Sequence, residues 1–439
     1  MTENTVSTPD IQAPGRDTSG RVSIWQLWSA KGETIWTWIA WAFAAYWILF
    51  TAGAFLNRRG LNELGGALIL CILVWAVVDR LWVRVDAVSI ASMATLSLSL
   101  LQVIWSREPE SVGSFIKYAS LCLVMALSRL LRLPAASSFK TRWALAAQTL
   151  IILIISLTIF RGGSWDGNTR HSGLFPNPNN LALIPLLLLF LVNRNDRLII
   201  RIGAHAMVVV VLAFSGTSGA MVAYAIGLTV HLISGLSRNA RFLATWLAVF
   251  GCVVAITLVA VGADQFLPDT RLTKQVSVMR TQFTTVFEGG DVAYYAQEKV
   301  LGSGSASAVW RLMHWRRTLG VYSEGTVVQE LIGFGPGSSV SILGVLPHNE
   351  YLRLLFEEGI VGFSLFMFAW YRMITTAPLG VRYVGLILAI YSFSENNLDN
   401  FPFMSLFILC LSAGVATKPL GPRSGRMLEP AWPAAGQRA

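Results

Sequence analysis

The residues best placed for chemistry stand just before a long apolar run, in the stretch VLPHNEYLRLLFEEGIVG that begins at Val345. His348 follows Pro347, and from Glu350 onward apolar residues recur at helical spacing. Because proline suits the first turn of a helix, we expect a helix to begin here, with His348 near its N-terminus. The partial positive charge at that end favours a neutral imidazole, which can act as a base. A histidine that only caps the helix is an equally good interpretation.

A second polar group lies in residues 161–180, RGGSWDGNTRHSGLFPNPNN. Its glycines, prolines and asparagines predict turns, and Pro178 can start the next helix. Arg170 stands in this turn between two apolar runs, where a planar guanidinium could bind an anion. A surface loop with an isolated Arg170 is the alternative, and His171 fits a hydrogen-bonded loop residue better than a ligand.

A third polar group is the short turn SGTSG, residues 215–219, between two further apolar runs. Its backbone amides could bind a phosphate, which makes Ser215 and Ser218 candidate binding residues. A plain tight turn explains the same pattern.

The stretch SAVWRLMHWRRTLG predicts an amphipathic helix that lies on the membrane, with Arg311 in its first half. Arg316 and Arg317 on the same helix are expected to contact lipid head groups. GFGPGSS, residues 333–339, predicts a compact turn that leads towards His348, and it lacks the GK[ST] of a P-loop.

The five histidines form no HExxH motif, and no DxD pair stands in the predicted outer loops. We therefore expect neither a metal site nor another cofactor. A transferase that works outside the cytoplasm would need a donor that is already activated on a lipid.

The elements that position these residues are membrane helices. Of the 439 residues, 54% are hydrophobic and only 13% are charged, and the mean hydropathy is +0.56. This composition excludes a soluble enzyme of ordinary domains. About twelve apolar runs of roughly twenty residues lie between residues 35 and 416, which predicts an all-α, polytopic membrane protein. The four cysteines fall within such runs and fit packing residues.

Lys and Arg concentrate on alternate loops, which places both termini in the cytoplasm and residues 161–180 and 263–358 outside; Arg58 and Arg59 oppose this bias. The predicted organisation is a disordered cytoplasmic tail at 1–34, nine spans at 35–262, an outer segment with the catalytic residues at 263–358, three spans at 359–416 and a disordered cytoplasmic tail at 417–439.

These motifs together resemble the superfamily of bacterial O-antigen ligases and O-antigen polymerases. The matching pieces are RHSGLFPNPNNLA, SGTSGA, Arg311-xxx-Trp315, GFGPGS and PHNEYLRLLFEEGIVG, in that order. The last piece is the most specific, and the resemblance covers roughly residues 140–415. One position departs from it, because the family often has Arg in the turn where this chain has Ser218.

The resemblance implies a GT-C-like fold of membrane helices at the bacterial inner membrane. It implies metal-independent transfer of a glycan from undecaprenyl diphosphate to a sugar hydroxyl on the periplasmic side. His348 would correspond to the essential histidine, and Arg311 and Arg170 to the arginines that bind the diphosphate. Further candidates for contact with diphosphate or glycan are Asn349, Ser215 and Ser218. The implied partners are the lipid-linked donor, a lipid A–core or glycan acceptor and membrane lipids, but no nucleic acid.

A ligase with lipid A–core as acceptor is the first expectation. A polymerase that joins lipid-linked repeats and a protein O-oligosaccharyltransferase are alternatives within the same group. A polysaccharide flippase or secondary transporter is the alternative of another class, but it would place charges along its spans, whereas here the spans are nearly free of them.

Overall fold

The computed structural model describes residues 24–56, 61–78, 85–106, 109–131, 140–158, 171–175, 177–192, 196–234, 236, 240, 244–245, 247–248 and 307–413. Every regular element in these ranges is helical, as predicted. The first eight helices are α1 (Ile24–Leu56), α2 (Leu61–Val78), α3 (Ala87–Ser106), α4 (Pro109–Leu131), α5 (Thr141–Thr158), α6 (Pro178–Leu191), α7 (Leu198–Ser215) and α8 (Ser218–Ser234). After residue 306 follow α12 (Ser307–Ser323), α13 (Val327–Ile332), α14 (Ser338–Leu343), α15 (Glu350–Thr376), α16 (Leu379–Tyr391), the short η3 (Asn397–Asp399) and α17 (Phe401–Ser412).

Five of the described helices are long and apolar enough to cross a membrane. The crossing segments are Gly32–Gly53, Ala87–Trp105, Ser111–Leu131, Thr141–Thr158 and Leu198–Ser215. Several shorter apolar helices accompany them, so the chain has the character of a multi-pass membrane protein. The count of twelve spans remains a prediction, and most of the run at 242–262 lies outside the described residues.

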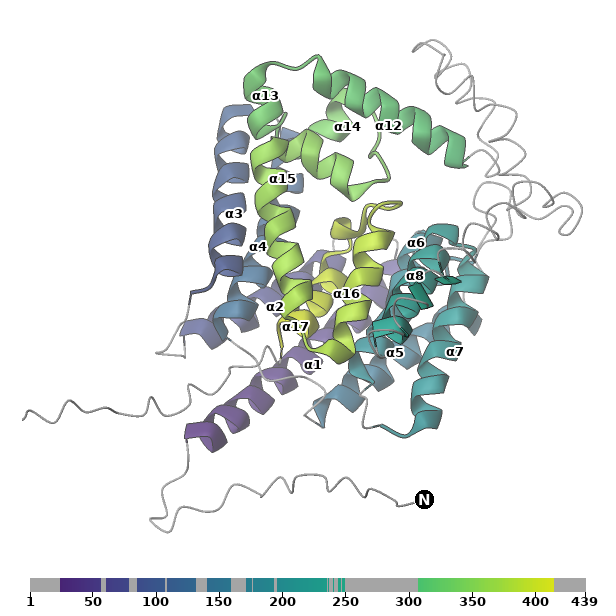
Figure 1. Cartoon of the computed structure of the whole chain (residues 1–439). Coiled ribbons are helices and arrows are strands. Elements are labelled where there is room, and N and C mark those ends of the chain that lie inside the picture. Colours follow the sequence, from purple (N-terminus) through teal and green to yellow (C-terminus); the bar gives the residue numbers. More distant parts are fainter. Residues whose placement is uncertain are drawn as a thin grey trace, which may run out of the picture.

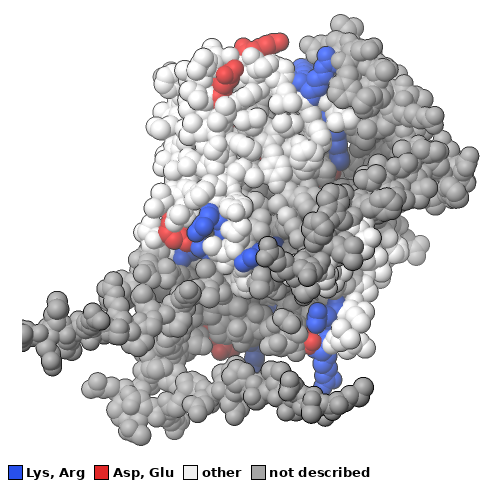
Figure 2. Space-filling view, in the orientation of Figure 1, with Lys and Arg blue, Asp and Glu red and all other residues white. Residues whose placement is uncertain are grey.

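The surface agrees with this character. In the view of Figure 2, charged side chains of the described residues lie above and below a broad uncharged area. Large apolar side chains are exposed on α3, among them Leu101, Ile104 and Trp105. Exposed apolar residues on a long helix are costly in water but suit the hydrocarbon of a bilayer.

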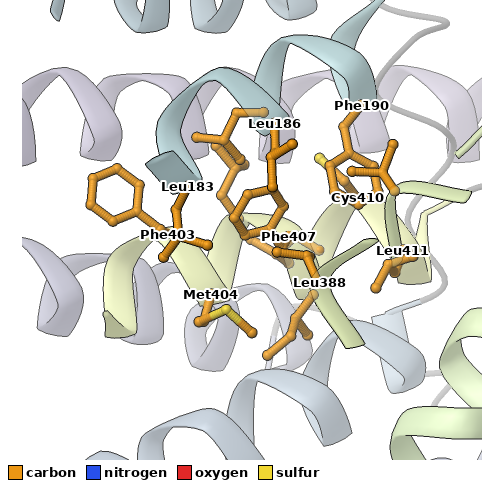
Figure 3. Packing of buried hydrophobic residues seen from close by; sticks show 14 of the residues in the cluster. Leu183, Leu186, Phe190, Leu388, Phe403, Met404, Phe407, Cys410 and Leu411 are labelled. Atoms are coloured by element: carbon orange, nitrogen blue, oxygen red, sulfur yellow. The ribbon is translucent and has the colours of Figure 1, made fainter. Parts of the chain in front are cut away.

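The centre of the helical body is α6, of which nearly every side chain is buried. A helix that is apolar all round is favourable only when other helices surround it. Leu183, Leu186 and Phe190 of α6 lie against Phe403 and Phe407 of α17 (Figure 3). The rings of Phe190 and Phe407 are 5.3 Å apart.

The helices α12, α13 and α14 lie together at one end of the body, over the adjacent ends of α3 and α15 (Figure 1). The end of α13 meets α15 at a break in that helix, at Gly359. Just before the break, the carbonyls of Phe356 and Glu357 accept hydrogen bonds from the amides of Phe334 and Gly335. The GFGPGSS segment therefore attaches the outer helices to α15, in addition to leading towards His348.

Two predicted boundaries differ from the structure. Helix α1 begins at Ile24, inside the stretch 1–34 that was expected to be a disordered tail. Helix α15 begins at Glu350, so Pro347 precedes the helix and does not stand in its first turn. The expectations for residues 1–23, 249–306 and 414–439 fall outside the described residues.

Candidate functional site

The centre of the candidate site is a carboxylate, Glu395, in the loop between α16 and η3. One oxygen accepts a hydrogen bond of 2.5 Å from Nη2 of Arg311, on α12. The other oxygen lies 3.3 Å from Nδ1 of His348. Asn179, at the start of α6, adds a hydrogen bond to the same carboxylate. Four segments far apart in the sequence therefore meet at one side chain.

His348 has a backbone conformation that residues other than glycine seldom adopt. Its φ is +51°, and it is the one residue other than glycine with a positive φ in the described part of the chain. Histidine tolerates this left-handed region better than most residues, but the conformation still costs free energy. The next residue, Asn349, caps α15, since its side chain accepts hydrogen bonds from the amides of Tyr351 and Leu352. His348 is therefore not the cap of the helix.

Helix α12 fixes the segment before α15 from one side. Nε1 of Trp315 donates a 2.8 Å hydrogen bond to the carbonyl of Pro347. His314 lies 3.1 Å through Nε2 from the carbonyl of Val345, and because a carbonyl only accepts, Nε2 carries the proton. The ring of Trp310 stacks on His314 at 5.1 Å and meets His348 edge-on at 5.5 Å.

An amphipathic helix on a membrane is expected to bury its apolar residues and expose its polar ones, and α12 does so only in part. Met313 is buried, but so are the polar His314 and Thr318, whereas Leu319 is 45% exposed. Thus the buried side of α12 includes polar residues that contact the segment before His348. Arg316 lies on the exposed surface of the helix, and Arg317 is half-buried.

The predicted polar groups near Pro178 and in the SGTSG turn reach the same place through Asn179. As predicted, α6 begins at Pro178, and Asn177 caps it. The Oδ1 of Asn179 accepts a hydrogen bond from the hydroxyl of Thr217, and its carbonyl accepts one from Tyr391. Because its Oδ1 is used in this way, the amide nitrogen is the group that can donate to Glu395.

The loop that carries Glu395 is fixed to the start of α15 by Glu350. The amide of Glu350 donates to the carbonyl of Ser392 at 2.8 Å, and its carboxylate accepts from the amide of Leu398 at 3.1 Å. Asn397 closes the loop internally with a hydrogen bond to the hydroxyl of Ser392. These contacts set the position of Glu395 relative to His348 without using the side chain of either residue.

The electrostatics of the site keep Glu395 ionised. Burial alone would raise the pKa of this carboxyl, which is only 7% exposed. The hydrogen bond with His348 and the charge of Arg311 outweigh burial and lower the pKa below its ordinary value. At His314 burial is instead the dominant effect: it lowers the pKa to about 4 and keeps the ring neutral.

This geometry defines what the side chains can do. A carboxylate at Nδ1 holds the proton on that nitrogen, which leaves the lone pair of Nε2 of His348 to accept a proton from a substrate. The side chains of His348 and Arg311 are 30% and 21% exposed, so both can be reached from solvent. Beyond the N–H that contacts Glu395, the guanidinium has further N–H groups for binding an anion.

The other predicted site residues take different places. Asn349 caps α15, and Ser215 donates its hydroxyl to the carbonyl of Leu212 within its own helix. Ser218 is exposed at the start of α8. Arg170 lies outside the described residues, and the adjacent His171 donates its amide to the carbonyl of Phe214.

A second group of charged residues lies deeper on α15. Arg353 contacts Glu350 at 3.6 Å and Glu357 at 3.4 Å, and its guanidinium lies 5.1 Å from the ring centre of Tyr118 on α4. The neighbouring Glu358 accepts a 2.6 Å hydrogen bond from Ser99 on α3. The four charged residues of this group are 0–2% exposed, so the group is closed to solvent.

Sequence reasoning missed Glu395. A signal for it is the polar stretch SENNLDN, residues 394–400, which lies between two apolar runs and, in the predicted topology, on the same side as His348. None of the described residues forms a group of His, Cys, Asp and Glu that could hold a metal ion.

Comparison with known proteins adds no family to this picture. No protein-family model matches the chain, and no curated protein matches it. The function must therefore be inferred from the geometry around Glu395 and from the resemblance of the motifs.

Proposed function

We propose that the protein is a membrane glycosyltransferase that moves a glycan from undecaprenyl diphosphate to an acceptor hydroxyl at the periplasmic face of the bacterial inner membrane. The observation that carries the proposal is the meeting of His348 and Arg311 at Glu395, in a protein of apolar helices. A base and a cation beside each other, both reachable from solvent, are what such a transfer requires.

The two side chains would have complementary tasks. Nε2 of His348 accepts the proton of the acceptor hydroxyl as its oxygen forms the new bond to the anomeric carbon. The bond between that carbon and the diphosphate oxygen breaks, and undecaprenyl diphosphate leaves with the electron pair. Arg311 binds the leaving diphosphate, whose charge a guanidinium can meet with parallel hydrogen bonds. One displacement of this kind inverts the anomeric carbon.

Glu395 would complete the base. It holds the Nδ1 proton of His348 and stabilises the imidazolium that forms when the acceptor proton arrives. Trp310, edge-on to His348, restricts the orientation of the ring. The diphosphate is bound by arginine in this scheme, so the proposal includes neither a metal ion nor another cofactor.

Transport is the rival function of another class. A flippase or secondary transporter needs polar groups that open in turn along a path through the membrane. The charged group around Arg353 is 0–2% exposed, so it lines no open path. His348 and Arg311, which solvent can reach, lie outside the five crossing segments found among the described residues, which favours surface chemistry.

Glycan profiling of a deletion strain tests the proposal and separates its forms. We propose ligation to lipid A–core first, so polymer should disappear from lipid A–core while long lipid-linked chains accumulate. Accumulation of single lipid-linked repeats would instead assign the polymerase reaction, and loss of glycan from proteins would assign protein O-oligosaccharyl transfer. An unchanged glycan profile of all three products in the deletion strain would refute the proposal.

A further inference from the structure

Arg311 is already paired in the free protein. Its Nη2 donates a 2.5 Å hydrogen bond to Glu395, so the cation that should bind diphosphate is neutralised by a carboxylate that is 7% exposed. A diphosphate that approaches Arg311 would meet the negative charge of Glu395 at the same place. The site thus contains an internal competitor for its own anion-binding group.

The contacts of Glu395 allow this competition to be resolved by exchange. The carboxylate also receives hydrogen bonds from His348 and Asn179, and its loop is fixed to α15 through Glu350. It can therefore lose Arg311 and still keep two donors. Arg311 has a long, flexible side chain that is 21% exposed, so it is the partner that can turn towards solvent.

We propose that Glu395 is a positioning residue that Arg311 exchanges for the diphosphate of the lipid-linked donor. In the free site Arg311 and His348 share the carboxylate. When the donor binds, Arg311 turns to the diphosphate, and Glu395 is left to His348 and Asn179. This inference rests on the proposed function, and it deepens that function by ordering donor binding before proton transfer.

The exchange has a cost and a benefit that can be measured separately. The cost is weaker donor binding, because part of the interaction between Arg311 and the diphosphate replaces an existing ion pair. The benefit is a full negative charge beside the imidazolium during transfer. A residue with only a structural role would not affect these two quantities in opposite directions.

The variant Glu395→Gln separates the two effects. Glutamine has nearly the same shape and can still accept from Nδ1 of His348, but it lacks the charge. We expect the variant to bind a lipid diphosphate about tenfold more tightly than the wild type, a modest fraction of the coupling measured for close charge pairs. We expect its turnover number to fall by about tenfold or more, because the imidazolium loses its counter-ion.

Binding should be measured on the full-length protein in detergent by calorimetry, with farnesyl diphosphate as the probe and farnesol as the uncharged control. Arg311→Gln should bind the probe more weakly than the wild type. Arg316→Gln, on the exposed surface of the same helix, should bind it like the wild type. Turnover of the same preparations gives the second quantity.

Two outcomes would overturn the inference in distinguishable ways. If the wild type binds the probe through Arg311 but Glu395→Gln binds it no more tightly, the exchange is wrong and the proposed function stands. If neither the wild type nor Glu395→Gln prefers farnesyl diphosphate to farnesol, the diphosphate site itself is absent and both proposals fail.

A second variant covers the case in which Glu395→Gln does not fold. Glu395→Asp keeps the charge but draws it back by one methylene, so it should weaken the pair with Arg311 and bind the probe more tightly than the wild type. A folded Glu395→Asp that binds the probe equally or more weakly would refute the exchange. Tighter binding cannot result from general loss of structure.

Discussion

Two groups of charged residues lie at the first half of α15, and they differ in their access to solvent. At the N-terminus, His348 and Arg311 share Glu395 and are 30% and 21% exposed. Less than three turns along the helix, Arg353 lies among three glutamates, and all four side chains are buried. Each group has one arginine, paired with a single carboxylate in the outer group and with several in the inner group, but only the outer group contains an imidazole and can be reached by a substrate.

The difference shows how burial decides what a charge can do. In the inner group, the side chain of Arg353 is only 3% exposed, so solvent offers it no alternative to its contacts with Glu350 and Glu357. In the outer group, Arg311 can exchange one anion for another. The outer group is therefore called the open group and the inner one the closed group. Glu350 belongs to the closed group and also holds the loop of Glu395, so the closed group positions the carboxylate of the open group.

The largest expected effect is at the imidazole of the open group. His348→Gln should lower transfer by about 10²- to 10⁴-fold, the usual contribution of a positioned base, because glutamine cannot accept the proton. His348→Asn should be equally poor, and asparagine tolerates the positive φ of this position, so the fold should be kept. Transfer assays with lipid-linked donor, at equal protein amounts, measure the effect.

Both variants should keep the thermal midpoint of the wild type within a few degrees. Recovery of most of the activity by His348→Gln would show that the side chain only orients the acceptor. The open group would then differ from the closed group in exposure, but it would contain no catalytic base.

The next effect concerns the cation of the closed group. Arg353→Met should destabilise the protein by about 3–5 kcal/mol, because it leaves buried carboxylates without their cation. Arg372→Met, at an exposed position of the same helix, should change stability by less than about 0.5 kcal/mol. Thermal unfolding in detergent compares the two. Equal stability of both variants would mean that Arg353 is no more essential to the fold than a surface arginine.

A smaller effect is expected at the break in α15 that ends the closed group. Gly359 has φ +65° and ψ −177°, and an added Cβ would lie 2.3 Å from the amide nitrogen of Gly333. Gly359→Ala should therefore cost at least about 1–3 kcal/mol for the backbone conformation alone. Gly320→Ala, in α12 with no atom near its added Cβ, should instead stabilise by roughly 0.5–1 kcal/mol. The thermal midpoint should therefore fall below that of the wild type in Gly359→Ala and rise above it in Gly320→Ala.

The smallest effect separates His314, which supports the open group, from the residues that react. Burial lowers the pKa of His314 to about 4, so its contribution to stability is complete above its ordinary value of 6.5 and is lost as the pH falls towards 4. In His314→Phe the thermal midpoint should decline less steeply across this interval. His348 and Arg317 also lower this pKa through their charge, and the hydrogen bond to the carbonyl of Val345 opposes them. A parallel decline in both proteins would exclude His314 as a source of the acid sensitivity.

The all-helical character and two of the segments that form the site, those of Arg311 and His348, could be predicted from the sequence. Apolar runs reveal helices whatever surrounds them, and polar turns between such runs on one side of a membrane must lie near the same surface. This reasoning placed Arg311 and His348 on one side of the membrane, and the structure brings them together at one carboxylate.

Side-chain partners could not be predicted in the same way. Glu395 gains its importance from Arg311, which lies 84 positions away in the chain, and no local pattern records such a pairing. The burial of Arg353, Glu357 and Glu358 was equally hidden, because charged residues among apolar ones at helical spacing are ordinarily assigned to the exposed face. In an aqueous protein such residues would face outward, whereas on a helix beside lipid the interior is the more polar side.

The contact between Gly333 and Gly359 has a consequence for how such a protein can diversify. It joins the outer helices to α15 through backbone atoms alone, so substitutions in neighbouring side chains leave the join intact. The chain length between the two glycines is constrained, while exposed positions on α12 and α13 are open to change. Related chains could therefore acquire new acceptors by altering these outer side chains, with the frame beneath them unchanged.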